Sequence, residues 1–308
     1  MSDLLIIGID HGFSLMKSSH FSFPTGLVAY DHEPYTRKDV LEYGGRYYVV
    51  GSGRQPIQRE KTLTDDYYLM TLAMIAREIA YRRTPPMANL YLAVGLPLTD
   101  FGRDKEAFED YLSKNGKPVS FRFEDREYTI AVREIEVFPQ GYAAALYSGM
   151  LTEPSMIVAD IGGWTVDLMR VDRQIPDAST SASLEMGMIR CLNLIIEVVR
   201  RDMGISMTSV QIESVLRGEG GHVDEQAEKI IHREAGKYVH DLLSSITEHG
   251  LDIRAIPVIF LGGGAALLKT HVPRTDRIFR PIILDDITMN AKAYELLAGK
   301  TAGRRQGV

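Results

Sequence analysis

Two segments of this chain, about 150 residues apart, share one pattern: a short apolar strand ends in aspartate, and the chain turns back through glycine. The two residues are Asp10 and Gly12 in the first segment and Asp160 and Gly162 in the second. A short apolar run that stops at turn residues is typical of a buried sheet strand. The repetition predicts two similar α/β halves.

Each predicted half also contains a later buried strand that runs into glycine, at Gly95 in the first half and at Gly262 in the second. Because ligands of α/β folds bind at the carboxyl ends of strands, we expect a cleft lined by these turns. The 308 residues fit two domains of ordinary size. We expect residues 1–152 and 285–308 to form domain I and residues 153–284 to form domain II.

The charge balance argues against a protein that coats nucleic acid by itself. The chain has 35 Lys and Arg against 41 Asp and Glu, a net charge of −6, whereas phosphate binding needs a concentrated basic face. A link to DNA through an adaptor protein stays open. The basic stretch Lys300–Arg305 is interpreted as a solvated C-terminal tail.

The single cysteine, Cys191, lies in an apolar stretch and is interpreted as a small core residue. One cysteine makes an internal disulfide impossible and fits a reducing compartment. The apolar run Leu4–Ile9 is too short for a signal peptide, and no run approaches the roughly 20 residues of a membrane helix. We therefore expect a cytoplasmic protein with no membrane attachment.

Hydrophobic periodicity and turn residues predict alternating strands and helices. Further strands are expected at 26–30, 43–50, 89–95, 119–123, 128–132, 134–138, 165–171 and 257–261. Helices are expected at 64–81, with Thr64 as its cap, and at 103–115, 140–150, 188–203, 209–216, 224–249 and 288–297.

The first aspartate turn continues into a strand that brings back Ser14 and Lys17. Such a hairpin offers backbone N–H groups, a hydroxyl and an ammonium to a polyphosphate. Asp10 can hold a water of a bound Mg²⁺, since this ion keeps several waters and few protein carboxylates. Ordinary turn chemistry is the alternative, because Asp and Gly are common at tight turns.

The second aspartate turn contains two glycines, Gly162 and Gly163, which let the backbone approach a ligand closely. Thr165 and Asp167 follow at alternate positions of the next strand. Asp167 lies on an otherwise apolar strand, so its carboxylate needs a partner or a ligand. A plain glycine hairpin is the alternative.

A third motif, Gly262-Gly263-Gly264, lies between a buried strand and a predicted helix. Three glycines leave no side chain in the way of a flat ring or a sugar, and they expose amides at the helix start. A tight strand-to-helix turn without a ligand is the alternative.

In this order, the three motifs resemble the first phosphate, second phosphate and adenosine motifs of the superfamily of actin, sugar kinases and DnaK-type chaperones. The resemblance spans roughly residues 5–298, and residues 138–145 and 289–293 look like its connecting helices. It implies an α/β actin-like fold of duplicated, ribonuclease H-like domains with a nucleotide cleft between two halves. Within the superfamily, Gly95–Leu98 and the string Asp160–Asp167 are most similar to ParM/StbA-type filament proteins.

The resemblance implies ATP, or GTP, and Mg²⁺ as cofactors. Asp10 and Asp160 would flank the Mg²⁺ shell through water, and Gln140, aided by Asp167, would orient the attacking water. Phosphoryl transfer needs mostly positioning and charge neutralisation, so a neutral glutamine can suffice. The residues implied to clasp the phosphates are Gly12, Ser14, Lys17, Gly162, Gly163 and Thr165, and those implied to line the adenosine are Gly262, Gly263 and Gly264.

Two residues depart from the family pattern, which usually has small polar residues at these places. His11 is interpreted as a turn residue satisfied by the backbone, with a catalytic base as the alternative. Trp164 is interpreted as packing over the glycine turn.

The function implied by the resemblance is an ATPase that polymerises into dynamic filaments for plasmid or DNA segregation. Its partners would be further copies of itself and a DNA-binding adaptor of the ParR type. Two alternatives stay open. A small-molecule kinase of this fold usually carries an inserted substrate domain, and a static scaffold of the MreB or FtsA kind usually carries a membrane-targeting element; neither feature is evident here.

Overall fold

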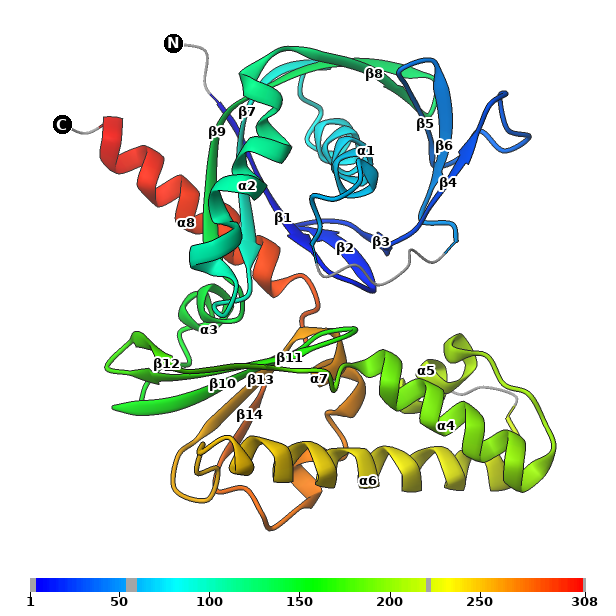
Figure 1. Ribbon diagram of the computed structural model, residues 1–308, viewed down its shortest axis with the longest axis vertical. Helices are drawn as coiled ribbons and strands as arrows, with labels where there is room; N and C mark the ends of the chain where they lie inside the picture. Colours follow the sequence, from blue (N-terminus) through cyan, green and yellow to red (C-terminus); the bar gives the residue numbers. More distant parts are fainter. Residues whose placement is uncertain (1–3, 54–59, 220–222, 307–308) are drawn as a thin grey trace. The chain divides into compact units, whose positions relative to one another are not determined.

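The computed structural model describes residues 4–53, 60–219 and 223–306, which divide into two compact units (Figure 1). Unit 1 contains the described residues up to Tyr147 and those from Thr288 onward, and unit 2 contains Ser148–Ile287. The assignment of functional domains to 1–152 with 285–308 and to 153–284 stays a prediction.

Unit 1 is built on a nine-stranded sheet with the order β3-β2-β1-β7-β9-β8-β5-β6-β4. The sheet curls around helix α1 (Asp66–Tyr81), as Figure 1 shows. Its strands are β1 (Leu5–His11), β2 (Leu15–Ser18), β3 (Ser22–Pro24), β4 (Leu27–Tyr30), β5 (Val40–Tyr43), β6 (Arg46–Val50), β7 (Met87–Leu96), β8 (Val119–Phe123) and β9 (Arg126–Pro139).

Helix α1 is apolar on nearly all sides, which explains why the sheet encloses it. Twelve of its sixteen residues are buried, and a helix that is hydrophobic all round belongs in a core. Helix α2 (Phe101–Ser113) adds Phe108 and Leu112 to the same core.

Strand β7 alternates between two cores, as expected for a sheet covered on both faces. Leu90, Leu92 and Val94 pack in the core around α1. Tyr91 and Ala93 pack in a second core with helix α8 (Met289–Gln306) and helix α3 (Tyr142–Tyr147).

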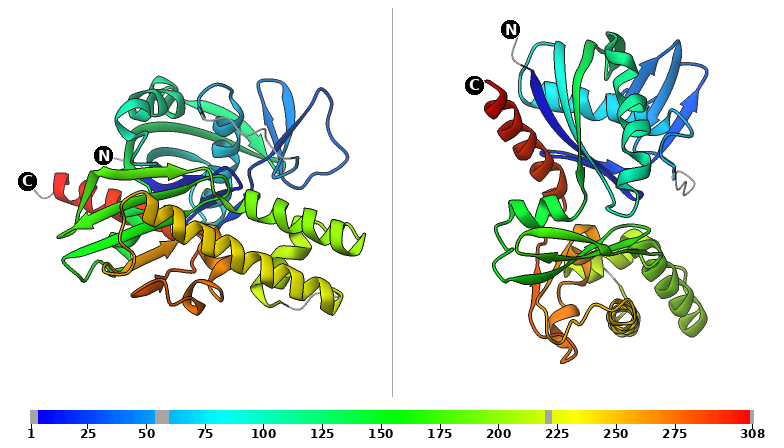
Figure 2. Two further views of the ribbon diagram at one scale, coloured as in Figure 1. Left: turned by 60° about the horizontal axis from the view of Figure 1, so that its bottom comes forward. Right: turned by 60° about the vertical axis from the view of Figure 1, so that its left-hand side comes forward.

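Unit 2 contains a five-stranded sheet with the order β12-β11-β10-β13-β14. Its strands are β10 (Ser155–Ile161), β11 (Val166–Asp172), β12 (Ile175–Leu184), β13 (Val258–Leu261) and β14 (Pro281–Ile283). Its helices are α4 (Met188–Met203), α5 (Ser209–Arg217), α6 (Glu225–Glu248) and α7 (Gly262–Leu268). Helices α4 and α6 lie side by side (Figures 1 and 2), and their apolar faces share one core with the sheet.

The predicted helix at 188–203 is confirmed as α4, and Cys191 is confirmed as a core residue because it is fully buried. The strands predicted at 128–132 and 134–138 are one strand, β9. Its register with β7 skips Arg133, since Leu90 pairs with Val132 and Tyr91 with Glu134. This bulge shifts the in–out alternation by one residue and so mimics a strand end in the sequence.

Three other expectations were wrong. The stretch Lys300–Arg305 is the end of α8 rather than a frayed tail, although its three basic residues are exposed as expected, and Arg305 Nη1 lies 2.7 Å from Glu134 Oε2. The N-cap position of α1 is occupied by Asp65 rather than Thr64, and the Asp65 side chain makes no capping hydrogen bond. The helix expected at 140–150 spans only α3, which ends at the exposed Tyr147.

Within residues 4–53, 60–219 and 223–306, no helix combines the length and the apolar character needed to cross a membrane.

Candidate functional site

The first aspartate turn joins β1 to β2, and its register sets Asp10 directly opposite Lys17. Lys17 Nζ lies 2.8 Å from Asp10 Oδ2. The two residues are only 8% and 2% exposed, so each neutralises the other where water contributes little. The hairpin therefore brings together an aspartate and a lysine that the sequence analysis assigned to one phosphate site.

The backbone of this turn is compact and is held from the side by Thr25. Its Oγ1 donates to Gly12 O at 2.7 Å, and its backbone N donates to Ser14 O at 2.9 Å. A Cβ at position 12 would lie 2.6 Å from Leu15 O. Glycine is therefore required at position 12 by close approach of the returning strand.

His11 is fully buried, and its ring contacts a side chain of α1. Its Nε2 lies 2.9 Å from Thr71 Oγ1, and that hydroxyl donates to Tyr67 O at 2.7 Å. Because the hydroxyl proton is used in this way, His11 Nε2 carries the proton and donates to Thr71. Its ring thus has a partner on α1 in addition to the backbone of Ile9, the kind of partner expected from the sequence.

Burial lowers the pKa of His11 from 6.5 to about 3, and the nearby charge of Lys61 acts in the same direction. The folded protein thus keeps His11 neutral, while the unfolded chain binds a proton as the pH falls through about 6.5. The free energy of unfolding therefore decreases as the pH is lowered from about 6.5 to about 3, because the unfolded state binds more protons than the folded state.

We expect the free energy of unfolding to drop by about 3 kcal/mol between pH 7 and pH 4 through His11 alone. Urea unfolding at the two pH values measures this against His11→Gln, which keeps a donor toward Thr71 and does not titrate. The variant should lose about 3 kcal/mol less than the wild type. Equal losses in the two proteins would contradict the assignment.

A buried ionic cluster ties the β1–β2 hairpin to α1 and α8. Glu78 accepts hydrogen bonds from Ser18 Oγ and from Arg82 Nε, the latter at 2.8 Å. Arg82 Nη2 lies 2.8 Å from Glu295 Oε2, and this oxygen also accepts from Gly8 N at 3.1 Å. Both strands of the hairpin are thus anchored by α1 and α8.

The cluster keeps Glu78 ionised although its residue is fully buried. Burial alone would raise the pKa of Glu78, but hydrogen bonds from Ser18 and His20 and the charge of Arg82 hold that pKa below its ordinary value. These residues lie far apart in the chain, and no motif in the sequence indicated this cluster.

Gln140 follows β9 and is half-buried. Strands β1, β7 and β9 are parallel neighbours, so Asp10 and Gln140 both come at the carboxyl-end edge of the sheet. Gln140 N donates to Leu96 O at 2.8 Å, and the next amide, of Gly141, donates to Asn290 Oδ1 at 3.1 Å. The backbone at Gln140 is therefore fixed by β7 and α8.

The second aspartate turn, in unit 2, repeats the register of the first. Asp160 pairs with Asp167 across β10 and β11, as Asp10 pairs with Lys17 across β1 and β2. Each first strand also has a parallel neighbour, β13 for β10 and β7 for β1. The internal repetition read from the sequence is therefore a repetition of hairpin geometry.

The N-terminus of α4 holds this second turn. Met188 N donates to Gly162 O at 3.0 Å, and Ile189 N donates to Gly163 O at 2.8 Å. Gly162 N in turn donates to Thr165 O at 2.9 Å and closes the hairpin. Amides that a helix start leaves without intrahelical partners thus fix the glycine turn.

Asp167 has two side-chain partners within unit 2. Ser183 Oγ on β12 donates to Asp167 Oδ1, and Thr165 Oγ1 lies 3.3 Å from Asp167 Oδ2. These contacts satisfy the need for a partner that the sequence analysis noted, and β12, which it did not anticipate, supplies one of them.

The three-glycine motif forms the first turn of α7 rather than a loop before it. Gly262 has φ of +88°, and a Cβ there would lie 2.3 Å from Asp160 Oδ1. Only glycine fits this position, because both the backbone conformation and the neighbouring carboxylate exclude a side chain. Gly262 and Asp160 are therefore adjacent.

The predicted residues fall into two groups, one in each unit. Asp10, Gly12, Ser14, Lys17 and Gln140 lie in unit 1. The unit 2 residues are Asp160, Gly162, Gly163, Thr165, Asp167, Gly262, Gly263 and Gly264.

In the described part of the chain, no three His, Cys, Asp or Glu side chains gather as a metal-binding group. The unit 1 group nevertheless fits Mg²⁺, which typically uses one or two carboxylates, several waters and the oxygens of a bound phosphate. Asp10 supplies such a carboxylate beside the ammonium of Lys17.

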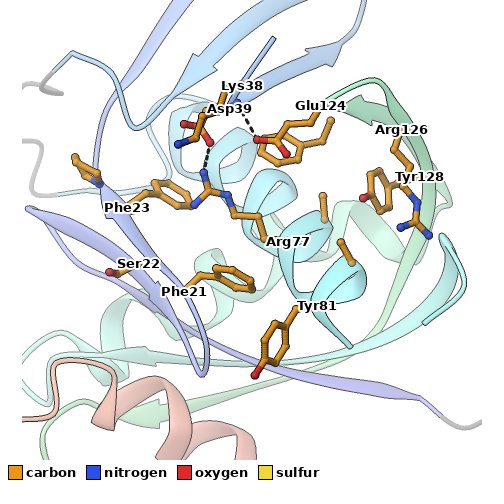
Figure 3. Close-up of a pocket in the computed structure, with 14 residues that line it drawn as sticks. Phe21, Ser22, Phe23, Lys38, Asp39, Arg77, Tyr81, Glu124, Arg126 and Tyr128 are labelled. Atoms are coloured by element: carbon orange, nitrogen blue, oxygen red, sulfur yellow. Dashed lines mark hydrogen bonds and ion pairs between the residues drawn. The ribbon is translucent and has the colours of Figure 1, made fainter. Parts of the chain in front are cut away.

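A separate groove of about 640 Å³ opens over the C-terminal half of α1 (Figure 3). Arg77 reaches across it to pair with Asp39, and its guanidinium carbon lies 5.0 Å from the Phe23 ring centroid. Among the described residues that line the groove, none belongs to the predicted site.

Two family models match the sequence, each within one unit. The N-terminal domain of actin like proteins matches residues 8–142, and the archaeal actin homologue, MreB-like C-terminal domain matches residues 158–274. Together the two matches span most of the chain. The chain belongs to the actin-like proteins.

Solved structures confirm the actin-like fold. The crystal structure of Ta0583, an archaeal actin homologue, has a TM-score of 0.79 at 17% identity and covers 97% of this actin-like protein and 100% of its own chain. The structure of the apo psk41 ParM protein has a TM-score of 0.73 at 18% identity, and the match covers 98% of this chain and 99% of the ParM chain. Bacillus thuringiensis ParM with ATP has a TM-score of 0.71 at 14% identity, and the match covers 98% of this chain and 100% of that ParM chain.

At these identities the likeness shows the fold alone. No curated protein is similar enough in sequence to count as a relative of this actin-like protein.

Proposed function

We propose that this actin-like protein binds and hydrolyses ATP, with GTP as the alternative, and that the hairpin turns of both units contact the nucleotide. The observation that carries the proposal is the shared register of the two hairpins, in which an aspartate at a strand end is followed by a glycine turn. The solved structures with this fold include Ta0583 in complex with ADP and Bacillus thuringiensis ParM with ATP, which supports the same ligand class here.

In this proposal the unit 1 hairpin provides its turn amides, Ser14 and Lys17 for the phosphates. The unit 2 hairpin provides Gly162, Gly163 and Thr165, and the glycines of α7 receive the adenosine. A bound Mg²⁺ would neutralise phosphate charge, and Asp10 and Asp160 would hold its waters.

The proposed role of Gln140 is to orient the attacking water. Its backbone is fixed at the carboxyl-end edge of the sheet by Leu96, and its side chain is half-buried. Asp167 is the second candidate for this role, although its carboxylate already accepts from Ser183.

We further propose that the protein assembles with copies of itself into dynamic cytoplasmic filaments that segregate plasmid or other DNA through an adaptor of the ParR type. The structure of the Alp12 filament, which shares this fold, supports assembly. The match of residues 158–274 to an MreB-like domain favours a second candidate, a static scaffold.

Pelleting and electron microscopy with ATP–Mg²⁺, with ADP–Mg²⁺ and without nucleotide test the proposal. Filaments should form with ATP–Mg²⁺ and shorten as ATP is consumed, and Gln140→Ala should give filaments that persist. Filaments that form equally without nucleotide would favour the scaffold. No filaments under any condition would overturn the assembly part.

A further inference from the structure

A buried lysine outside the predicted site lies beside the turn that joins β1 to β2 at Gly12–Ser14, here called the phosphate turn. Lys61, in the segment before α1, is only 9% exposed. Its Nζ lies 5.2 Å from the ring centroid of Phe13 and 5.9 Å from that of Tyr67. Phe13 is the residue between Gly12 and Ser14, so Lys61 contacts the turn at its centre.

An ammonium in a buried position requires compensation for its lost hydration. Two aromatic faces supply part of it, since a cation is attracted to the face of a ring within about 6 Å. A carboxylate also lies within electrostatic range of Lys61. A hydrogen bond from Arg103 lowers the pKa of Asp104 below its ordinary value, and the charge of Lys61 acts in the same direction.

The segment that carries Lys61 is itself anchored to α2. Tyr111 Oη donates to Thr64 O at 2.8 Å and accepts from Tyr68 N at 2.7 Å. Phe108, also on α2, packs edge-on against the His11 ring with centroids 5.1 Å apart. The turn residues on both sides of Gly12 are therefore backed by side chains that α1 and α2 hold in place.

We propose that Lys61 is a positioning residue for the phosphate turn: its ammonium holds the Phe13 ring and so keeps Gly12 and Ser14 in the conformation that receives a polyphosphate. The inference rests on the proposed nucleotide binding. Lys61 acts through Phe13 and does not itself contact the ligand.

A double-mutant cycle on the full chain tests the inference, with ATP–Mg²⁺ affinity measured by calorimetry. Lys61→Met keeps the apolar stem and removes the charge, and Phe13→Leu removes the ring. Each is expected to weaken ATP binding about tenfold, and the double variant by about the same factor, because both changes break one contact. Lys61→Arg should stay within about threefold of the wild type, since arginine also binds aromatic faces.

Lys105→Met is the matched control, since Lys105 Nζ lies 5.6 Å from the Phe101 ring centroid on α2. It should leave ATP affinity within about twofold. Urea unfolding of every variant shows whether a loss of affinity reflects a loss of folded protein.

Three results would overturn the inference. They are unchanged affinity in Lys61→Met, a double variant weakened about a hundredfold as for independent sites, or a Lys61→Arg variant as weak as Lys61→Met. If the wild-type protein binds no ATP, the proposed function itself is wrong. If the wild type binds ATP and only the variants show other affinities than expected, the proposed function is unaffected.

Discussion

Replacing Asp10 by asparagine is expected to reduce Mg²⁺-dependent ATP hydrolysis by at least about 10³-fold, roughly 4 kcal/mol of barrier. The substitution removes the carboxylate proposed to hold the metal's waters. It also leaves the buried Lys17 ammonium without the carboxylate that lies 2.8 Å away, so the charge of the phosphate turn changes as well. Steady-state phosphate release measures the effect.

Asp31→Asn is the matched control, because Asp31 forms an exposed ion pair with Arg46 on the surface of the same unit. It should hydrolyse ATP at the wild-type rate. Circular dichroism must show that Asp10→Asn is folded, since breaking a buried pair also destabilises the protein. A folded Asp10→Asn variant with wild-type turnover would remove Asp10 from the site.

Replacing Glu78 by alanine is expected to lower the free energy of unfolding by about 3–5 kcal/mol, the cost of breaking a buried ion pair by removing one partner. Glu78 is fully buried and accepts from three residues, Ser18, His20 and Arg82. Its loss leaves the hydroxyl, the imidazole and part of the guanidinium without an acceptor. Urea unfolding at pH 7 measures the change.

Glu225→Ala gives the comparison, since Glu225 pairs with Lys229 at the same i,i+4 spacing but on an exposed helix face. Exposed pairs contribute about 0.5 kcal/mol or less. If Glu78→Ala unfolds at nearly the same urea concentration as Glu225→Ala, the cluster does not anchor the hairpin.

The sequence predicted the two hairpins well because their signals are local. An apolar strand that ends in Asp10 or Asp160 and turns at glycine fixes a strand, a turn and a returning strand within about a dozen residues. The same locality explains why α4 was predicted with its observed bounds, since its apolar residues repeat at helical spacing and Gly204 follows its last residue.

Contacts between distant segments could not be predicted in this way. His11 meets Thr71, Lys61 meets Phe13, and Glu78 meets Ser18 only because the sheet curls around α1. In the sequence, each of these side chains looks like an ordinary turn or helix residue, because nothing near it in the chain indicates its partner.

The length of α8 was missed for a related reason. Gly299 and Gly303 disfavour helix on propensity alone, but the helix continues because Ala298 is buried in the core shared with β7. Tertiary packing here outweighs local preference.

The most direct test of the central claim is the rate of ATP hydrolysis per subunit as a function of protein concentration, with no acceptor added. We predict a low rate below a threshold concentration and a higher rate above it, because assembly is proposed to complete the site for hydrolysis. Gln140→Ala should assemble at a similar threshold but hydrolyse about 10²-fold more slowly. A rate per subunit that is independent of concentration, together with strong stimulation by a sugar or an acid, would contradict the filament account and indicate a kinase.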